Sequence, residues 1–346
     1  MIEIALTLIL SLSILIGWFF IFPVRFAKAE RSEDPIVYPP EGFLYSYVLH
    51  LHTQFSYDSL GKPEDVMRTR DIHGIDFVLV TDHDNDHIGK FADDRLIAGK
   101  EVKLNDEEGN LLGDMLLVGD LKIVAHPFRS KYRWRLEKSP EYFLELIDLR
   151  DALLERKTKL FLYLLCGLFL YPVAGKRIVG NYAKLVDTEL YVRRYFEESW
   201  KSRVVGGLDH HVKLYLREVR KRVLIPDYGL SFLLMRNYLL TDRQVKGKED
   251  FLQSLRDGIN LLSFSPKPSF VWTEDRTIKV YSPFSNTFVV LLSEGGERRE
   301  VLGSNVIFDN LKEDTYFILG YTYLWRIGRL LFGVKPLFVS DRLEVR

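Results

Sequence analysis

The sequence predicts an α/β fold: a (β/α) barrel, preceded by an apolar helix and followed by a small antiparallel β-sandwich. Three observations predict it. Short apolar runs that end in polar residues alternate with helical patterns, residues 4–22 are almost entirely apolar, and after Pro266 the pattern changes to short strands separated by turns. In a (β/α) barrel the C-terminal ends of the strands form the active face, so polar residues at those ends are the candidate functional residues.

Composition limits the partners that the chain can have. The chain has 346 residues, too many for one small core, and 47% of them are hydrophobic. Its 48 basic and 48 acidic residues cancel, so bulk charge gives no support for a nucleic-acid partner, although local basic clusters can exist. The one cysteine, Cys166, lies in an apolar run, which excludes a disulfide framework and a thiolate zinc site. Any metal must therefore be held by His, Asp and Glu.

The N-terminal apolar segment is long enough to span a bilayer at about 1.5 Å per residue. A cleaved signal peptide is the alternative, but the basic residues that would begin it are missing. We therefore expect residues 1–23 to be an uncleaved anchor of a single-pass membrane protein. Arg25, Lys28 and Arg31 follow the segment, and this bias places the rest of the chain in the cytoplasm.

The barrel is expected to occupy residues 44–264, after a proline-rich linker at residues 24–43. Its first strand is predicted at residues 44–51. A helix from Pro63 to Gly74 follows, since proline suits the first turn of a helix and glycine its C-terminal stop. Further strands are expected at residues 77–81, 96–104 and 116–125.

Residues 140–200 are predicted to be helical. Within them, residues 160–174 are nearly all apolar, but this stretch is short for a membrane span. It is interpreted either as a core helix or as a helix in the membrane interface, with the flanking lysines reaching toward the headgroups. A single crossing would place the candidate ligands before and after it on opposite sides of the membrane, so it is not expected.

Residues 265–346 are predicted to form the β-sandwich, because short strands alternate with turns such as Glu294-Gly295-Gly296. The expected strands lie at residues 277–281, 287–292, 306–308, 316–323 and 337–339.

Imidazoles and carboxylates gather at the predicted strand ends. His50 and His52 close the first strand, and because side chains alternate along a strand, both rings can aim at one point. Asp58 lies a short loop away, and His83 comes from the next strand. Such a convergence is typical of a metal site. Asp82 is a candidate to orient a ligand from behind.

The order of these groups resembles the PHP superfamily, named after polymerase and histidinol phosphatase. The resemblance covers residues 45–264, and it is specific because its motifs occur together and in order. The motifs are His50-x-His52, Ser56-x-Asp58, Thr81-Asp82-His83, Glu101, Ala125-His126-Pro127 and Gly207-x-Asp209-x-His211.

The resemblance implies a distorted (β/α)7 barrel with two or three divalent metal ions (zinc, manganese or iron) and hydrolysis of phosphoesters. Glu101, His83 and Asp209 would be the catalytic residues, with Glu101 bridging two metals. The implied ligands are His50, His52, Glu101 and Asp209 for the first metal, His126 with Glu101 for the second, and Asp58, His83 and His211 for the third.

One ligand departs from the family pattern. The family usually supplies another histidine to the second metal, yet His87 is the only histidine between His83 and His126, and none lies between His126 and His210. Asp114 stands where that histidine is often found, and a carboxylate can also bind these metals. Asp114 is therefore either a replacement ligand or a solvated turn residue.

A basic loop follows His126-Pro127 and contains Arg129, Lys131, Arg133 and Arg135. One interpretation is a clamp for a substrate phosphate or a lipid headgroup, made by Arg129, Lys131 and Arg133; the other is a solvated basic loop. The remaining histidines, His73, His87 and His210, are interpreted as packing or solvated residues.

These observations predict a membrane-anchored, metal-dependent phosphoesterase of class EC 3.1, which activates water against a phosphorylated small molecule or lipid headgroup. Two alternatives remain: a membrane-bound metal scaffold without hydrolysis, and a metal-dependent hydrolase of a non-phosphorylated substrate. Nucleic acid is the weakest of the candidate partners because the net charge is zero.

Overall fold

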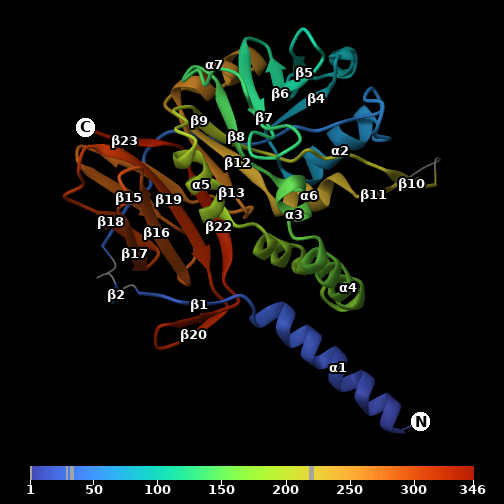
Figure 1. Cartoon of the computed structure of the whole chain (residues 1–346), viewed down its shortest axis with the longest axis vertical. Helices are drawn as coiled ribbons and strands as arrows, with labels where there is room; N and C mark the ends of the chain where they lie inside the picture. Colours follow the sequence, from blue (N-terminus) through green and yellow to red (C-terminus); the bar gives the residue numbers. More distant parts are fainter. Residues whose placement is uncertain (1, 29, 32–34, 218–221) are drawn as a thin grey trace.

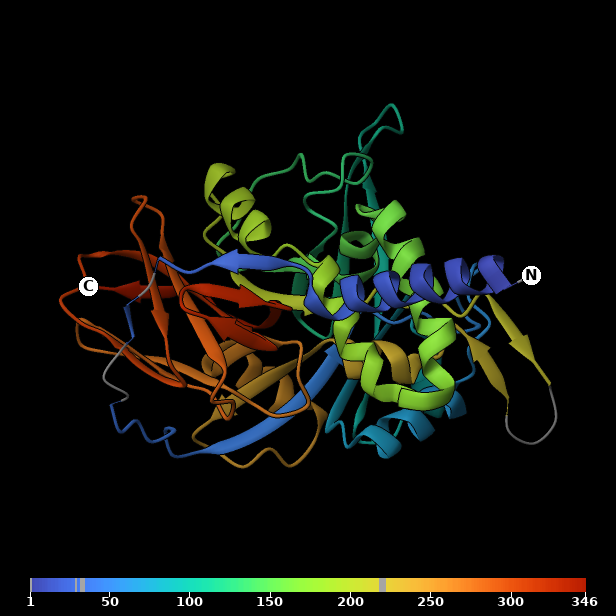
Figure 2. The ribbon, with the colours of Figure 1, turned by 90° about the horizontal axis from the view of Figure 1, so that it is seen from below.

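The computed structural model describes residues 2–28, 30–31, 35–217 and 222–346 (Figure 1). Helices and strands build one mixed body from which the N-terminal helix projects (Figures 1 and 2). The helices are α1 (Ile2–Ile21), α2 (Pro63–His73), η1 (His87–Phe91), α3 (Leu149–Leu154), α4 (Lys157–Ala174), η2 (Gly175–Leu185), α5 (Thr188–Glu197), α6 (Tyr228–Leu234) and α7 (Lys248–Asp257), where η marks a 3₁₀ helix.

One large mixed sheet forms the frame of the body. One half of it runs in the order β12-β3-β4-β5-β6-β7-β8-β9, with β3–β4–β5 and β7–β8–β9 parallel. These strands are β3 (Phe43–Leu49), β4 (Phe77–His83), β5 (Leu96–Asn105), β6 (Leu111–Val118), β7 (Leu121–Ala125), β8 (Phe143–Asp148), β9 (Arg203–Gly207) and β12 (Arg236–Thr241).

This half of the sheet curls until its last strand returns to its first. The amide of Leu208, just after β9, donates to the carbonyl of Leu49, and the amide of His52 donates to the carbonyl of His210. The connections depart from a regular strand–helix alternation, because β5, β6 and β7 are joined as antiparallel hairpins. Of the crossovers expected in this region, α2 between β3 and β4 forms as predicted.

The prediction that residues 140–200 are all helical is wrong at its start. Residues Phe143–Asp148 form β8, a strand that is buried throughout. A strand covered on both faces shows no alternation of polar and apolar residues, so its sequence resembles a buried helix. The helices α3, α4 and α5, with η2 between the last two, follow as expected.

A β-sandwich occupies the C-terminal region. A separate sheet of β14-β15-β18 packs through an apolar core, which includes Val280, Ile278 and Ile318, onto the far half of the large sheet. Because β13 pairs with β22, the predicted boundary at residues 264/265 falls within a continuous sheet. The strands are β13 (Ile259–Ser263), β14 (Phe270–Glu274), β15 (Thr277–Tyr281), β16 (Thr287–Ser293), β17 (Arg298–Leu302), β18 (Asn305–Phe308), β19 (Asp314–Thr322), β22 (Lys335–Ser340) and β23 (Leu343–Val345).

The segment expected to be a linker is bound to the sandwich. Strand β1 (Val24–Phe26) pairs with β21 (Leu330–Phe332), which forms a hairpin with β20 (Trp325–Ile327), and β2 (Glu30–Arg31) pairs with β17. The Arg25 guanidinium also forms ion pairs with Glu189 and Glu300. A small two-stranded ribbon, β10 (Leu214–Leu216) with β11 (Val223–Ile225), completes the fold.

Helices α1 and α4 contact one another (Figure 2), and both carry exposed apolar side chains. The C-terminal end of α1 packs through Phe19 onto Tyr163 of α4, with ring centroids 4.9 Å apart. The exposed apolar side chains include Leu6, Ile9, Leu10 and Ile14 on α1, and Phe161, Leu164, Leu168, Phe169 and Val173 on α4.

Among the described residues, the helical stretch Lys157–Glu197 is long and apolar enough to cross a membrane, whereas Ile9–Ile21 of α1 is a shorter apolar stretch. A single crossing by Lys157–Glu197 does not fit the fold, because α3 before it and α5 within its end both contact β8. The exposure of α4 also contradicts the interpretation of residues 160–174 as a core helix.

Candidate metal centre

Five strand ends bring candidate ligands to one place. His50 and His52 follow β3, His83 ends β4, His126 follows β7, Asp148 ends β8 and Asp209 follows β9. Glu101 joins them from within β5, where it pairs with His83. Since β3, β4, β7, β8 and β9 end at the same edge of the curled sheet, side chains far apart in sequence meet there.

The Glu101 carboxylate lies at the middle of the cluster and is 2% exposed. Its Oε2 is 3.4 Å from His50 Nε2, 3.3 Å from His52 Nε2 and 3.1 Å from His83 Nδ1. Its other oxygen, Oε1, is 3.3 Å from His126 Nε2. The two oxygens therefore face different imidazoles, which is the arrangement of a carboxylate that bridges two cations.

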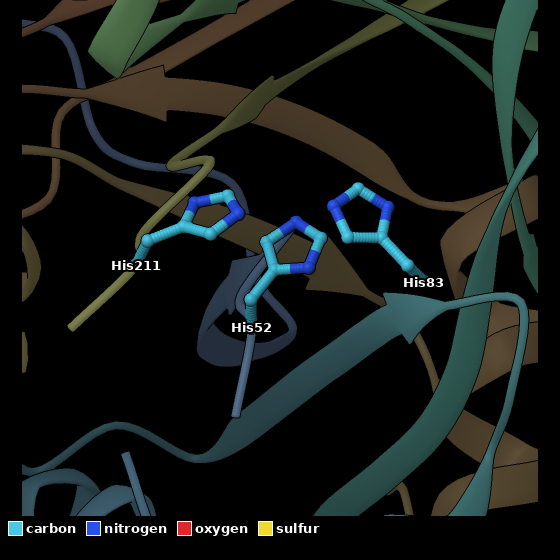
Figure 3. Close-up of side chains that lie close together, drawn as sticks. All are labelled: His52, His83 and His211. Atoms are coloured by element: carbon cyan, nitrogen blue, oxygen red, sulfur yellow. The ribbon is translucent and has the colours of Figure 1, made fainter. Parts of the chain in front are cut away.

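Two aspartates extend the cluster away from Glu101. Asp209 Oδ1 lies 3.5 Å from His52 Nε2 and 3.2 Å from His211 Nδ1. Asp58 lies 3.6 Å from His83 Nε2 and 3.1 Å from His211 Nε2. Figure 3 shows the rings of His52, His83 and His211 side by side, although they come from three separate segments. This group has the composition expected for a third metal.

Several ligand atoms are buried without a hydrogen-bond partner. They include the Nε2 atoms of His50, His52 and His211 and Oε2 of Glu101. Burying such atoms unsatisfied costs free energy, and a divalent cation that accepts their lone pairs would remove that cost. The described residues therefore fit a metal cluster built only from nitrogen and oxygen ligands.

In three of the histidines, the ring nitrogen that does not face Glu101 contacts another polar side chain. His50 Nδ1 lies 2.8 Å from Glu145 Oε1, His52 Nδ1 lies 3.0 Å from Ser56 Oγ, and His126 Nδ1 lies 3.1 Å from Asp151 Oδ2. These contacts fix the ring orientation and direct Nε2 into the cluster. Asp82 contributes as the sequence suggests, because its carboxylate accepts hydrogen bonds from Ser56 and from Thr53.

The backbone is strained at three of these positions. His50, His126 and Asp209 have φ values of 63°, 49° and 42°, in the left-handed region that non-glycine residues rarely adopt. Each such residue costs on the order of 1–3 kcal/mol, and strain of this kind concentrates at functional sites. The fold thus holds these three side chains in place against a local preference of the chain.

Burial and neighbouring charges set the protonation of His83 and Glu101. Desolvation lowers the pKa of His83 to about 4, which leaves the imidazole neutral at neutral pH with a lone pair to donate. Burial disfavours ionised Glu101, but the facing His50 and the close imidazoles of His126 and His52 keep its pKa well below the ordinary value. Both groups are therefore in the charge state that metal binding requires.

Sequence reasoning missed four residues of the centre. Glu145, Asp148 and Asp151 lie among the candidate ligands, and Arg150 pairs with Asp209 at 2.7 Å. Asp148 Oδ2 is 3.4 Å from His126 Nδ1, 3.8 Å from His50 Nδ1 and has no hydrogen-bond partner. For two of them the sequence contains a signal. Acidic residues at positions 145 and 148 end an apolar run, as ligands at a strand end do.

Asp114 is not a solvated turn residue. It lies within β6, is 1% exposed, and its Oδ1 is buried without a hydrogen-bond partner. Burial, together with the nearby Glu101 carboxylate, raises the pKa of Asp114 to about 6. The interpretation of Asp114 as a solvated turn residue is therefore wrong. Asp148 is a second carboxylate that can take the place of the missing histidine.

The members of the basic loop have different partners. Arg129 pairs with Asp151 at 2.6 Å, beside the centre. Lys131 lies over the ring of Tyr132, which itself packs on His126. Arg133 instead pairs with Glu198 at 3.0 Å, at the end of α5.

The three remaining histidines stay outside the cluster. His73 packs on Phe232 and His87 is exposed. His210 turns away from its neighbours and hydrogen-bonds with Ser231, with 2.7 Å between Nδ1 and Oγ. These positions agree with the interpretation of these residues as packing or solvated.

No family model and no curated protein matches the chain. Among solved structures, a protein of Bacteroides vulgatus is similar to it at 12% sequence identity, over 91% of this chain and 99% of that one. It is described as a two-domain protein containing a predicted PHP-like metal-dependent phosphoesterase, and the TM-score is 0.32. A similarity with this score assigns no function to the chain.

Proposed function

We propose that this chain is a metal-dependent phosphoesterase that uses two or three divalent ions, such as zinc, manganese or iron. One observation carries the proposal: the buried Glu101 carboxylate faces three imidazoles with one oxygen and a fourth imidazole with the other. Clusters of metals bridged in this way suit the hydrolysis of phosphate esters. The proposed ligands are His50, His52, Asp58, His83, Glu101, His126, Asp148, Asp209 and His211.

The bound metals would supply an activated water and neutralise charge on the phosphate oxygens. The residues of the chain do the rest. Glu101 fixes the spacing of the cluster, and Glu145, Ser56 and Asp151 orient the histidines. His83, the histidine ligand with the largest exposure of its side chain at 12%, lies on the side from which water and substrate can arrive.

Two arginines are placed to bind the substrate phosphate. Arg129 pairs with Asp151 and Arg150 with Asp209, so both guanidinium groups lie beside the centre. Their side chains are 34% and 38% exposed, which leaves donors free for a planar, bidentate contact with phosphate. Arg133 is a weaker candidate than the sequence suggested because Glu198 already binds it.

Helix α3 suggests an amphiphilic substrate. Asp151 and Arg150 on this helix contact the metal centre, whereas Leu149 and Leu153 line an apolar groove of about 540 Å³ formed with α4, η2 and α6. The groove continues into the exposed apolar face of α4. A phosphorylated lipid would place its phosphate at the centre and an acyl chain in the groove.

The attachment to a membrane is part of this proposal. The exposed apolar faces of α1 and α4 would lie in the bilayer and in its interface, respectively. Arg25 and Lys28 after α1 favour a cytoplasmic metal centre.

The test uses the full-length protein in a neutral detergent. Metal content is measured first, and then turnover of aryl phosphate monoesters and diesters, phosphatidic acid, and phosphate-free aryl esters and amides after manganese or zinc loading. We expect bound metal and turnover of a phosphorylated substrate, both lost in Glu101→Gln and kept in Glu107→Gln, which changes an exposed acid.

Three outcomes would contradict the proposal. Metal binding without turnover would favour the scaffold, and turnover of the phosphate-free substrates alone would favour a different hydrolase. Absence of both metal and turnover would overturn the assignment of a metal centre.

A further inference from the structure

A second cavity, of about 500 Å³, lies between the C-terminal end of α1, η2 and the start of β22. None of the residues that line it belongs to the metal centre. Figure 1 shows the end of α1 beside the β20–β21 hairpin, and the amide of Gly333 donates to the carbonyl of Ile21 there. The cavity therefore joins the apolar helix to the body of the protein.

The charge of this cavity has one sign. Within the part of the chain that the structure describes, no aspartate or glutamate lines it. Its basic residues come from η2, the loop after β13 and the first residue of β22: Lys176, Arg177, Lys184, Lys267 and Lys335.

Two of these lysines lie close to one another, Lys184 buried and Lys335 half-buried. Lys184 is 6% exposed, and its ammonium group donates to the carbonyls of Phe19 and Phe20, at 2.9 Å each. Among the described residues, no carboxylate lies within ion-pair distance of Lys184 or Lys335. Burial, together with the nearby charge of Lys335, lowers the pKa of Lys184 to about 7.

A charge buried without a partner of opposite charge is costly, and a bound counter-ion reduces that cost. The remaining walls are apolar and aromatic, with Phe264, Phe284 and Leu337 among them. An anion that also carries an apolar part would match both surfaces. Leu324 of the cavity wall is followed by Trp325, which is exposed. The cavity therefore adjoins an exposed apolar side chain.

We propose that this cavity binds a phosphate-bearing anion, held by Lys184 and Lys335 inside and by Lys176, Arg177 and Lys267 at the rim. Phosphate supplies several acceptor oxygens for these ammonium and guanidinium donors. The same chemistry is offered by free phosphate and by the headgroup of an anionic lipid, and the experiment separates these two sources. The site does not depend on the function proposed for the metal centre.

The test compares the full-length protein with Lys335→Met. In the first arm, thermal unfolding is followed during titration with inorganic phosphate, against sodium chloride of matched ionic strength. We expect phosphate to raise the Tm of the wild type. In Lys335→Met, the Tm without phosphate should rise because a half-buried charge with no carboxylate partner among the described residues is removed, and phosphate affinity should fall at least about tenfold.

In the second arm, binding is measured to vesicles of phosphatidylcholine with and without phosphatidylglycerol. A headgroup ligand predicts that the wild type prefers the anionic vesicles and that Lys335→Met loses part of this preference. A response to phosphate without any difference between the vesicles identifies a soluble phosphate ligand instead.

Lys312→Met is the matched control because it removes an exposed lysine that does not line the cavity, and Lys335→Arg should retain binding. The proposal is overturned when Lys335→Met keeps the wild-type phosphate response, or when the wild type responds to neither phosphate nor anionic vesicles. Turnover at the metal centre is recorded in the same samples. Its absence would contradict the phosphoesterase but not the anion site.

Discussion

The metal centre and the lysine-lined second cavity, called the cationic cavity below, would bind ligands of opposite charge. In the centre, carboxylates such as Glu101, Asp148 and Asp209 surround the imidazoles, and ligand atoms remain unsatisfied. In the cavity, Lys184 and Lys335 face no carboxylate among the described residues. The chain has a net charge of zero, yet these two regions do not neutralise each other. The local balance of buried charge therefore indicates the sign of a ligand better than the total does.

Removal of metal should produce the largest difference between the two regions. Chelation is expected to abolish turnover and to lower the free energy of unfolding, by about 4 kcal/mol when the metal is present at roughly a thousand times its Kd. The stabilisation by phosphate that depends on Lys335 should persist in the chelated protein. Calorimetry with and without chelator measures both effects, and loss of the phosphate response on chelation would show that the two regions are one site.

Exchange of carboxylates should identify the replacement for the missing histidine. Asp148→Asn is expected to lower activity and metal affinity about a hundredfold, because Asp148 lies within 3.4 Å of His126 and has an unpaired oxygen. Asp114→Asn should cost less than about tenfold, since Asp114 forms no ion pair with a histidine among the described residues. Metal titrations of both variants test this order, and the reverse order would make Asp114 the ligand.

Neutralising an arginine beside the centre should affect substrate binding. Arg129→Met is expected to raise KM for a phosphorylated substrate about tenfold, because a charge-assisted contact is lost. Arg133→Met is its control, since Arg133 pairs with Glu198. Steady-state kinetics of the two variants decide the question, and equal KM values would remove Arg129 from the phosphate site.

A third charged cluster, around Glu189, contains both acidic and basic side chains. Its contribution to stability should depend on pH but not on a bound ion. Burial would raise the pKa of Glu189, but its contacts with Arg298 and Arg25 hold it below the ordinary value. The stability that it contributes is therefore present above its unfolded pKa, about 4.3, and is lost as the pH falls through the lower folded value.

Glu189→Gln should lower the free energy of unfolding at pH 7 by on the order of 1 kcal/mol. The difference from the wild type should shrink below about pH 4, as the wild-type carboxyl becomes protonated. Urea unfolding at several pH values measures it, and a difference that is constant with pH would exclude the ionised carboxylate as its cause.

The sequence predicted the candidate ligands that lie at the ends of recognisable strands. His50, His52 and His83 could be placed because each follows a short apolar run, and the structure brings all three to Glu101. Asp148 was missed because β8 is buried on both faces and lacks an alternating pattern.

Contacts between distant segments outside the predicted ligand set could not be predicted. Arg150 meets Asp209 across 59 positions, and Lys184 meets the end of α1 across 165. No local propensity encodes such pairs, because they depend on how the whole sheet curls. The cationic cavity belongs to this class, since its five basic residues come from separate parts of the chain.

The pairing of β1 with β21 and of β2 with β17 has a consequence for how the protein would search for substrate. A flexible tether of about twenty residues would let a domain wander roughly 25 Å from its anchor. Here Arg25 and the two short ladders remove that slack. With α1 inserted as proposed, the catalytic edge would keep one height and one tilt above the bilayer, and encounters with substrate would be confined to the plane of the membrane.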